Sequence, residues 1–132
     1  MTRCIAIDTN AYSALMEGDE NVASQLAGAK LVIVPIAVLG ELHDGFKNGS
    51  RAAFNERKLR EFLDLANVET PGITAKTAEI YATIKNYLRE QGRPVPTNDI
   101  WIAAQALENH AAILTFDKHF AFMEECGVIL AS

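Results

Sequence analysis

The sequence predicts an α/β fold in which a mainly parallel sheet is flanked by helices. Strand and helix patterns alternate along the whole chain, which favours right-handed β-α-β crossovers. Residues 31–34 read Leu-Val-Ile-Val, a β-branched run that is apolar on both faces, as in a buried parallel strand. The chain has 132 residues, the size of one domain, and shows no internal repeat. We therefore expect a single domain over residues 1–132.

Five short segments have the pattern of strands. The first is apolar and ends in an acid, and the second is the β-branched run just described. The third is a weak candidate that precedes a Pro-Gly turn. The last two are short apolar runs near the end of the chain. The five segments are residues 3–8, 31–34, 67–70, 112–115 and 128–130.

Four helices are expected in the first half of the chain. Residues 9–18 and 19–28 place apolar side chains three and four positions apart. Residues 36–47 follow Pro35, which is suited to a helix start, and end before an Asn-Gly-Ser stop signal. Residues 51–66 are more charged and form the fourth helix.

Three further helices are expected in the second half. Thr74 is placed to cap a long helix that continues to Gln91, where a glycine follows. The Pro-Val-Pro run at residues 94–96 predicts an extended linker. Residues 99–109 and 119–125 then form two helices, the second of them short.

Composition indicates a globular protein. Hydrophobic residues make up 49% and charged residues 22%, and no apolar run reaches the roughly 18 residues of a membrane span. We expect a cytoplasmic protein without a signal peptide, in which Cys4 and Cys126 are reduced core residues. The net charge of −5 argues at first against a nucleic-acid partner, but four of the acids belong to the candidate site described next. Without these four acids the net charge of the remaining residues is −1 (−5 + 4), so positive and negative charges on the rest of the surface are nearly balanced.

Four acids fall where α/β sheets form ligand sites, at or soon after the carboxyl ends of strands. Asp8 ends the first strand, and Asp117 lies just past the strand at 112–115. Asp99 opens a strongly apolar helix, and Glu41 lies on a helix with a buried face. We therefore expect these four side chains to converge.

Such a cluster needs a cation, because apolar surroundings and mutual repulsion both disfavour ionised carboxylates. The expected ligands are all hard oxygens, which suit Mg²⁺ or Mn²⁺. One or two such ions can orient a phosphodiester and lower the pKa of a water molecule for attack. This chemistry requires acids and metal but no covalent nucleophile.

With these residues in place, the chain resembles the PIN-domain nucleases, and among them the VapC-type toxins of bacterial toxin–antitoxin pairs. The matching segments span nearly the whole chain in family order, and four of them together are specific although each alone is weak. They are Ile7-Asp8-Thr9-Asn10, Gly40-Glu41-Leu42, Asn98-Asp99-Ile100-Trp101-Ile102-Ala103-Ala104 and Leu114-Thr115-Phe116-Asp117.

The resemblance implies a three-layer sandwich with a five-stranded sheet in the order 3-2-1-4-5. It implies an endonuclease that cleaves RNA with Mg²⁺ or Mn²⁺ held chiefly by Asp8 and Asp99, while Glu41 and Asp117 complete the acidic pocket. It also implies that residues such as Asn10 and Thr115 order this pocket by hydrogen bonds. The implied partners are a small VapB-like antitoxin and a second copy of the chain.

Each site residue also has a simpler interpretation. Asp8 and Asp99 could be helix caps, Glu41 could face solvent, and Asp117 could be a turn residue. His43, His110 and His119 match no metal-site spacing and are interpreted as surface or packing residues, and Trp101 as a core anchor. The charged helix at 51–66 is interpreted as a solvated face, with an RNA contact as the alternative. Lys47, Arg93 and Lys118, which are expected nearer the pocket, are equally good candidates for an RNA contact.

Three alternative functions remain open at this stage. A phosphoryl-transfer enzyme or receiver domain would use Asp8 as its phosphorylated residue, although Asn10 stands where such phosphatases need a second acid. A housekeeping PIN nuclease would share the pocket but lack an antitoxin. A non-catalytic binding module is also conceivable, although no pocket acid is lost.

Overall fold

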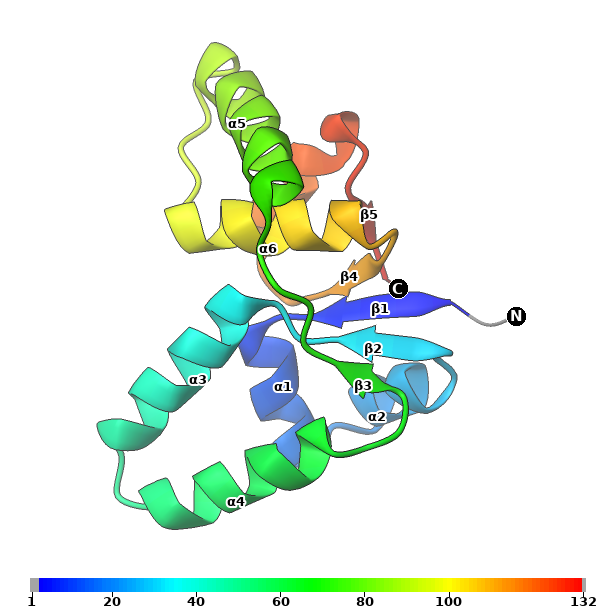
Figure 1. Cartoon of the computed structure of the whole chain (residues 1–132), viewed down its shortest axis with the longest axis vertical. Coiled ribbons are helices and arrows are strands. Elements are labelled where there is room, and N and C mark those ends of the chain that lie inside the picture. Colours follow the sequence, from blue (N-terminus) through cyan, green and yellow to red (C-terminus); the bar gives the residue numbers. More distant parts are fainter. Residues whose placement is uncertain (1–2, 132) are drawn as a thin grey trace.

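A parallel sheet forms the centre of the molecule. The computed structural model describes residues 3–131, so residues 1, 2 and 132 of the expected domain lie outside the described part. All strand pairs are parallel and the order is β3-β2-β1-β4-β5, which confirms the expected topology (Figure 1). The strands are β1 (Cys4–Ile7), β2 (Leu31–Ile33), β3 (Val68–Glu69), β4 (Ala112–Leu114) and β5 (Ile129–Leu130).

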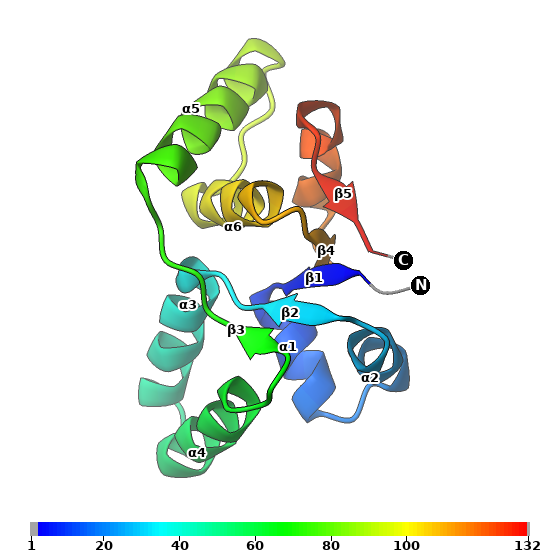
Figure 2. The ribbon, with the colours of Figure 1, turned by 45° about the vertical axis from the view of Figure 1, so that its right-hand side comes forward.

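Helices flank this sheet from both sides. Helices α1 to α4 gather beside β2 and β3, whereas α5, α6 and the 3₁₀ helix η1 gather beside β4 and β5 (Figure 2). Between residues 3 and 131, none of them is long and apolar enough to cross a bilayer. Their bounds are α1 (Thr9–Met16), α2 (Glu20–Ala27), α3 (Ile36–Lys47), α4 (Ala52–Leu63), α5 (Ala75–Glu90), α6 (Thr97–Glu108) and η1 (Lys118–Cys126).

Two helices differ from the prediction in ways that matter for the site. Helix α6 begins at Thr97, directly after Pro96, whose fixed backbone angle suits a helix start. Asp99 therefore lies inside the first turn of α6, where the helix dipole favours an acid. The short helix expected near the end of the chain is a 3₁₀ helix, capped by the Asp117 side chain and ended by Gly127 at φ +102°.

The core lies on both faces of the central strands. Ile5 and Ile7 of β1 and Ile113 of β4 are completely buried, as the unbroken apolar runs predicted. Helices α5 and α6 pack together through Tyr81 and Trp101, whose rings stack with centroids 4.1 Å apart. Trp101 is half-buried in this contact, which agrees with its interpretation as an anchor. Because α6 carries Asp99, this packing also fixes one wall of the site.

A buried glutamine joins α6 to the start of α3. Gln105 is fully buried, and its Oε1 accepts a hydrogen bond from the backbone N–H of Ile36 at 2.8 Å. Its Nε2 donates to the carbonyl of Pro71, also at 2.8 Å. The first contact satisfies an N–H that the first turn of α3 leaves without a helical partner. Gln105 thereby positions α3, the helix that carries Glu41.

We expect Gln105→Ala to lower the free energy of unfolding by about 2–4 kcal/mol, because it leaves two partly buried backbone groups without partners and opens a cavity. Urea denaturation of the purified protein measures this change. Gln91→Ala, at the exposed end of α5, is the matched control and should change stability by less than about 0.5 kcal/mol. Equal stability of both variants would show that Gln105 does not position α3.

Candidate functional site

The four predicted acids meet in one pocket. Asp8 directly follows β1, Asp117 comes shortly after β4, Glu41 lies in α3 and Asp99 in α6. The first turns of α3 and α6 stand beyond the carboxyl end of β1 (Figure 1). The pocket has a volume of about 290 Å³ and is lined by Asp8, Thr9, Asn10, Glu41, Asp44, Gly45, Asp99, Ile102 and Asp117.

Asp8 is both a helix cap and a pocket residue, so the two interpretations of this residue are compatible. The residue is 4% exposed. Oδ1 accepts the backbone N–H of Ala11 at 2.8 Å, and Oδ2 accepts the hydroxyl of Thr115. Burial raises the pKa of Asp8 above its ordinary value, although both hydrogen bonds act in the opposite direction.

Thr115 connects two of the acids. Its hydroxyl donates to Asp8 and accepts the backbone N–H of Asp117 at 2.8 Å. Asp117 in turn accepts the backbone N–H of His119 at 2.9 Å and so caps η1. The hydrogen bonds implied for Thr115 are therefore present, and they hold the loop after β4 in place.

Glu41 faces the pocket and is held there by two neighbours. One carboxylate oxygen accepts the hydroxyl of Thr9, and Oε2 accepts Nδ2 of Asn98 at 3.1 Å. Sequence analysis did not single out Thr9 or Asn98, although each is directly next to a predicted acid. Asn10 is exposed on the pocket wall and makes no side-chain hydrogen bond to another residue of the described chain, so its ordering role stays a prediction.

Sequence analysis did not predict His119 as a site residue. Its Nδ1 lies 3.4 Å from Oδ2 of Asp99 and 3.1 Å from Oδ1 of Asp117. No sequence spacing indicated this, because the contact depends on how η1 packs against the first turn of α6. Asp44 was also missed: it is exposed at the pocket rim, one helical turn after Glu41.

Asp99 has the most perturbed carboxyl group of the site. Its Oδ2 is buried and has no hydrogen-bond partner within residues 3–131. Burial, with a smaller contribution from the charge of Asp117, raises the pKa of Asp99 to about 6, while nearby His119 acts in the opposite direction. An ionised carboxylate is therefore costly here unless a cation compensates it.

The residues present fit a divalent cation. Asp99, Asp117 and His119 each offer a ligand atom, and these atoms lie within 4.8 Å of one another. Asp8 and Glu41 face the same pocket. A cation would partner the buried Oδ2 of Asp99 and offset both the burial and the repulsion by Asp117 that raise the pKa of this group.

Comparisons with known proteins identify the family. A model of the PIN domain matches residues 5–125. The chain belongs to the PIN domain family. This PIN domain is 35% identical over 96 residues to the protein named Ribonuclease VapC4 of Mycobacterium tuberculosis, an alignment that covers 73% of this chain and 74% of that protein. It is 29% identical over 93 residues to Ribonuclease VapC5 of the same organism. That alignment covers 70% of this chain and 69% of VapC5.

Solved structures share the fold. This PIN domain is similar to the VapBC2 complex of Rickettsia felis bound to a DNA fragment from its promoter, with a TM-score of 0.84 and 23% identity. That match covers 97% of each chain. VapBC-1 of nontypeable Haemophilus influenzae matches with a TM-score of 0.83 and 22% identity, covering 98% of this chain and 97% of that one. These similarities establish the fold across nearly the whole chain.

We expect Asp99→Asn to stabilise the metal-free protein at about pH 7.5, by about 1–3 kcal/mol. The folded-state pKa of Asp99, about 6, lies above its ordinary value of 3.8, so ionisation costs stability as the pH rises through this interval. Below about pH 4 the parent carboxyl is protonated and the difference should vanish. Urea denaturation with EDTA at both pH values measures this.

Asp64→Asn, on the exposed end of α4, provides the control and should change stability by less than about 0.5 kcal/mol at either pH. A metal-free Asp99→Asn protein that is no more stable than the parent at about pH 7.5 would contradict the raised pKa of Asp99.

Proposed function

We propose that this PIN domain is a metal-dependent endoribonuclease and the toxin of a VapBC-type toxin–antitoxin pair. The observation that carries the proposal is the convergence of Asp8, Glu41, Asp99 and Asp117 on one pocket. The names of the relatives support RNA as the substrate, since they are called ribonucleases. A homodimer and a cytoplasmic location stay predictions from the resemblance and from composition.

In this proposal Asp8 and Asp99 hold Mg²⁺ or Mn²⁺, and Glu41 and Asp117 complete the site. When bound, the cation lowers the pKa of a water molecule and stabilises the charge on the leaving oxygen. The chain contributes fixed carboxylates: Thr115 orients Asp8, and the loop that it holds positions Asp117. A carboxylate that does not hold the cation can accept a proton from the attacking water, so no covalent nucleophile is required.

The comparisons do not favour the phosphoryl-transfer alternative. The chain matches the PIN domain model over residues 5–125, and its curated relatives are named ribonucleases. Asn10 also stands where such phosphatases need a second acid. A housekeeping PIN nuclease without an antitoxin shares the same pocket, and the partner experiment below separates it from a toxin.

We expect Asp8→Asn and Asp99→Asn each to reduce RNA cleavage at least about 100-fold, because each removes a charge that holds the cation. Cleavage of a labelled RNA with Mg²⁺ or Mn²⁺, and its loss with EDTA, measures the activity. Asp64→Asn, remote from the pocket, should cleave at the parental rate. Parental activity of Asp99→Asn would refute the assignment of the site.

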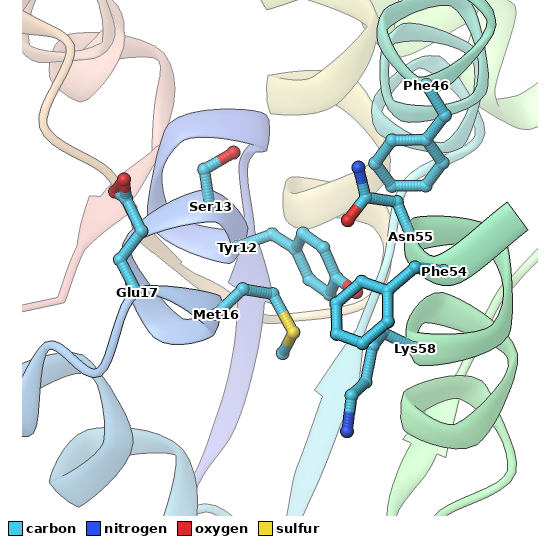
Figure 3. Close-up of a pocket in the computed structure, with 8 residues that line it drawn as sticks. All are labelled: Tyr12, Ser13, Met16, Glu17, Phe46, Phe54, Asn55 and Lys58. Carbon is cyan, nitrogen blue, oxygen red and sulfur yellow. The ribbon is translucent and has the colours of Figure 1, made fainter. Parts of the chain in front are cut away.

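An aromatic pocket next to the acids supports a protein partner. It lies between α1, α3 and α4, has a volume of about 270 Å³, and includes Tyr12, Met16, Phe46 and Phe54 in its lining. Figure 3 shows the Tyr12 ring reaching from α1 towards Phe54 of α4. The Tyr12 hydroxyl is buried and has no hydrogen-bond partner within the described chain. The pocket thus combines apolar side chains with polar ones, and the Tyr12 hydroxyl is a donor without a partner in the described chain. The polar lining residues are Ser13, Glu17, Asn55 and Lys58.

We propose that this pocket receives an apolar side chain of the antitoxin. Tyr12 lies one helical turn after Asp8 on α1, and Phe46 follows Glu41 along α3 by little more than one turn. A segment seated in the aromatic pocket would therefore lie beside the acids and could cover them. The solved neighbours include the VapBC2 and VapBC-1 complexes, which supports a small partner protein of this kind.

We expect Met16→Lys to weaken the antitoxin complex at least about tenfold while leaving RNA cleavage unchanged, because it places a charge at an apolar contact. Co-expression with a candidate VapB-like antitoxin, followed by co-purification and growth measurements, tests this. Leu65→Lys replaces another exposed apolar residue, 52% exposed against 44% for Met16, and should have no effect. If the antitoxin co-purified with the Met16→Lys protein and restored growth as it does for the parent, this docking site would be excluded.

A further inference from the structure

We propose that a basic groove beside the acidic pocket binds the backbone of single-stranded RNA, an inference that rests on the proposed ribonuclease function. The groove lies between the end of α5, the Pro-rich linker and the first turn of α6, and has a volume of about 450 Å³. Its lining includes three cations and three apolar side chains, namely Lys85, Arg89, Arg93, Leu88, Val95 and Ile100.

The charge of this groove is opposite to that of the whole chain. Three cations line it and no carboxylate does, although the protein has a net charge of −5. None of the three forms an ion pair with an acid in residues 3–131. Three cations without acidic partners around one hollow favour an anionic ligand with several charges.

Two of the cations are held in place and the third is available. Nζ of Lys85 donates to the hydroxyl of Tyr81 at 3.2 Å. The guanidinium group of Arg93 lies 4.9 Å from the centroid of the Phe122 ring. Arg89 is exposed and makes no side-chain hydrogen bond, ion pair or ring contact with the described residues. We therefore expect Arg89 to contribute most to ligand binding.

The groove and the acidic pocket share the first turns of α6. Ile100 lines the groove, whereas the adjacent Asp99 lines the pocket. A chain of contacts also links them: Asp99 lies 3.4 Å from His119, and the His119 ring lies 6.3 Å from that of Phe122, over which Arg93 lies. Figure 1 shows the linker from α5 descending to the start of α6, with α3 on the other side. A strand leaving the pocket can therefore reach the groove within a few nucleotides.

The apolar surface of the groove favours a single strand over a duplex. Leu88 and Ile100 are 3% exposed and lie beneath the groove, so the accessible apolar surface among the cations comes from Pro94, which is exposed, and Val95, which is half-buried. An unpaired base can contact this apolar surface, or the plane of an arginine guanidinium group, while its phosphates contact the cations. The bases of a duplex are stacked inside the helix and could not reach it.

The charged helix α4 is a weaker candidate for the same role. The cationic groups of Arg51, Arg57 and Lys58 lie 4.1 to 5.7 Å from the centroid of the Phe54 ring. Lys58 also pairs with Glu61 at 3.7 Å. Helix α4 also carries Glu56 and Glu61 among its cations, whereas no carboxylate lines the groove, which supports the interpretation of α4 as a structural, solvated face.

Fluorescence anisotropy with a labelled single-stranded RNA of about 12 nucleotides tests the groove, with EDTA present to prevent cleavage. At about 0.1 M salt we expect Arg89→Ala to weaken binding about fivefold and the Arg89→Ala/Arg93→Ala protein about 20-fold. The slope of log K against log salt should fall by about 0.7 for each cation removed. Arg89→Lys should keep most of the affinity because it keeps the charge.

Arg60→Ala, an exposed cation on α4, is the matched control and should bind like the parent. Thermal unfolding shows whether loss of Arg93 from the Phe122 ring disturbs the fold, and Arg89→Ala alone tests the groove if it does. Parental affinity of Arg89→Ala would overturn the proposal. So would equal competition by duplex DNA of the same length, or by a polyglutamate peptide of the same charge, since a single RNA strand should be preferred.

The measurement separates this proposal from the proposed function. Binding is measured without metal, so it is informative even if the protein does not cleave RNA. A protein that cleaves RNA while its groove variants bind normally refutes the groove alone. A protein that binds through the groove but never cleaves with Mg²⁺ or Mn²⁺ refutes the ribonuclease proposal alone.

Discussion

The site depends on carboxylates that are held together although they repel one another. Asp99 is the clearest example: burial and the charge of Asp117 raise its pKa to about 6, and one of its oxygens has no hydrogen-bond partner in the described chain. A folded chain can keep such a group only if the rest of the structure supplies the stability. The arrangement is unfavourable in the metal-free protein, and a bound cation would offset the cost. This cost is the physical argument for the cation in the proposed function.

Three features of the scaffold hold the repelling carboxylates together. The parallel sheet places Asp8 and the loop that carries Asp117 at one edge, and Thr115 ties the two together. Gln105 connects α6 with α3, the helices that bring Asp99 and Glu41 to the same pocket. These contacts are hydrogen bonds from buried or half-buried polar groups, which are expensive to break and therefore fix the geometry. The acids are thus positioned before any ligand arrives.

Opposite charges lie close together around the first turn of α6. The acidic pocket and the basic groove share this turn, yet each is lined by groups of one sign. A phosphodiester strand needs both environments, because a cation must neutralise the cleaved phosphate while basic side chains hold its neighbours. The overall charge of −5 conceals this division, which explains why net charge was a poor guide to the ligand.

Sequence alone determined the α/β class and most elements, because hydrophobic period and turn residues are local signals: the apolar run at 31–34 and the Pro-rich linker are examples. It also indicated the four acids: Asp8 and Asp117 follow strands that share one edge of a parallel sheet, and Glu41 and Asp99 lie on apolar helices within the segments that resemble the family. The contact of His119 with Asp99, the hydrogen bonds of Gln105 and the lack of an acidic partner for Arg89 among residues 3–131 were decided only by the tertiary structure. Each depends on how separate elements pack, and no spacing along the chain encodes the relative position of two helices that meet only in the folded protein.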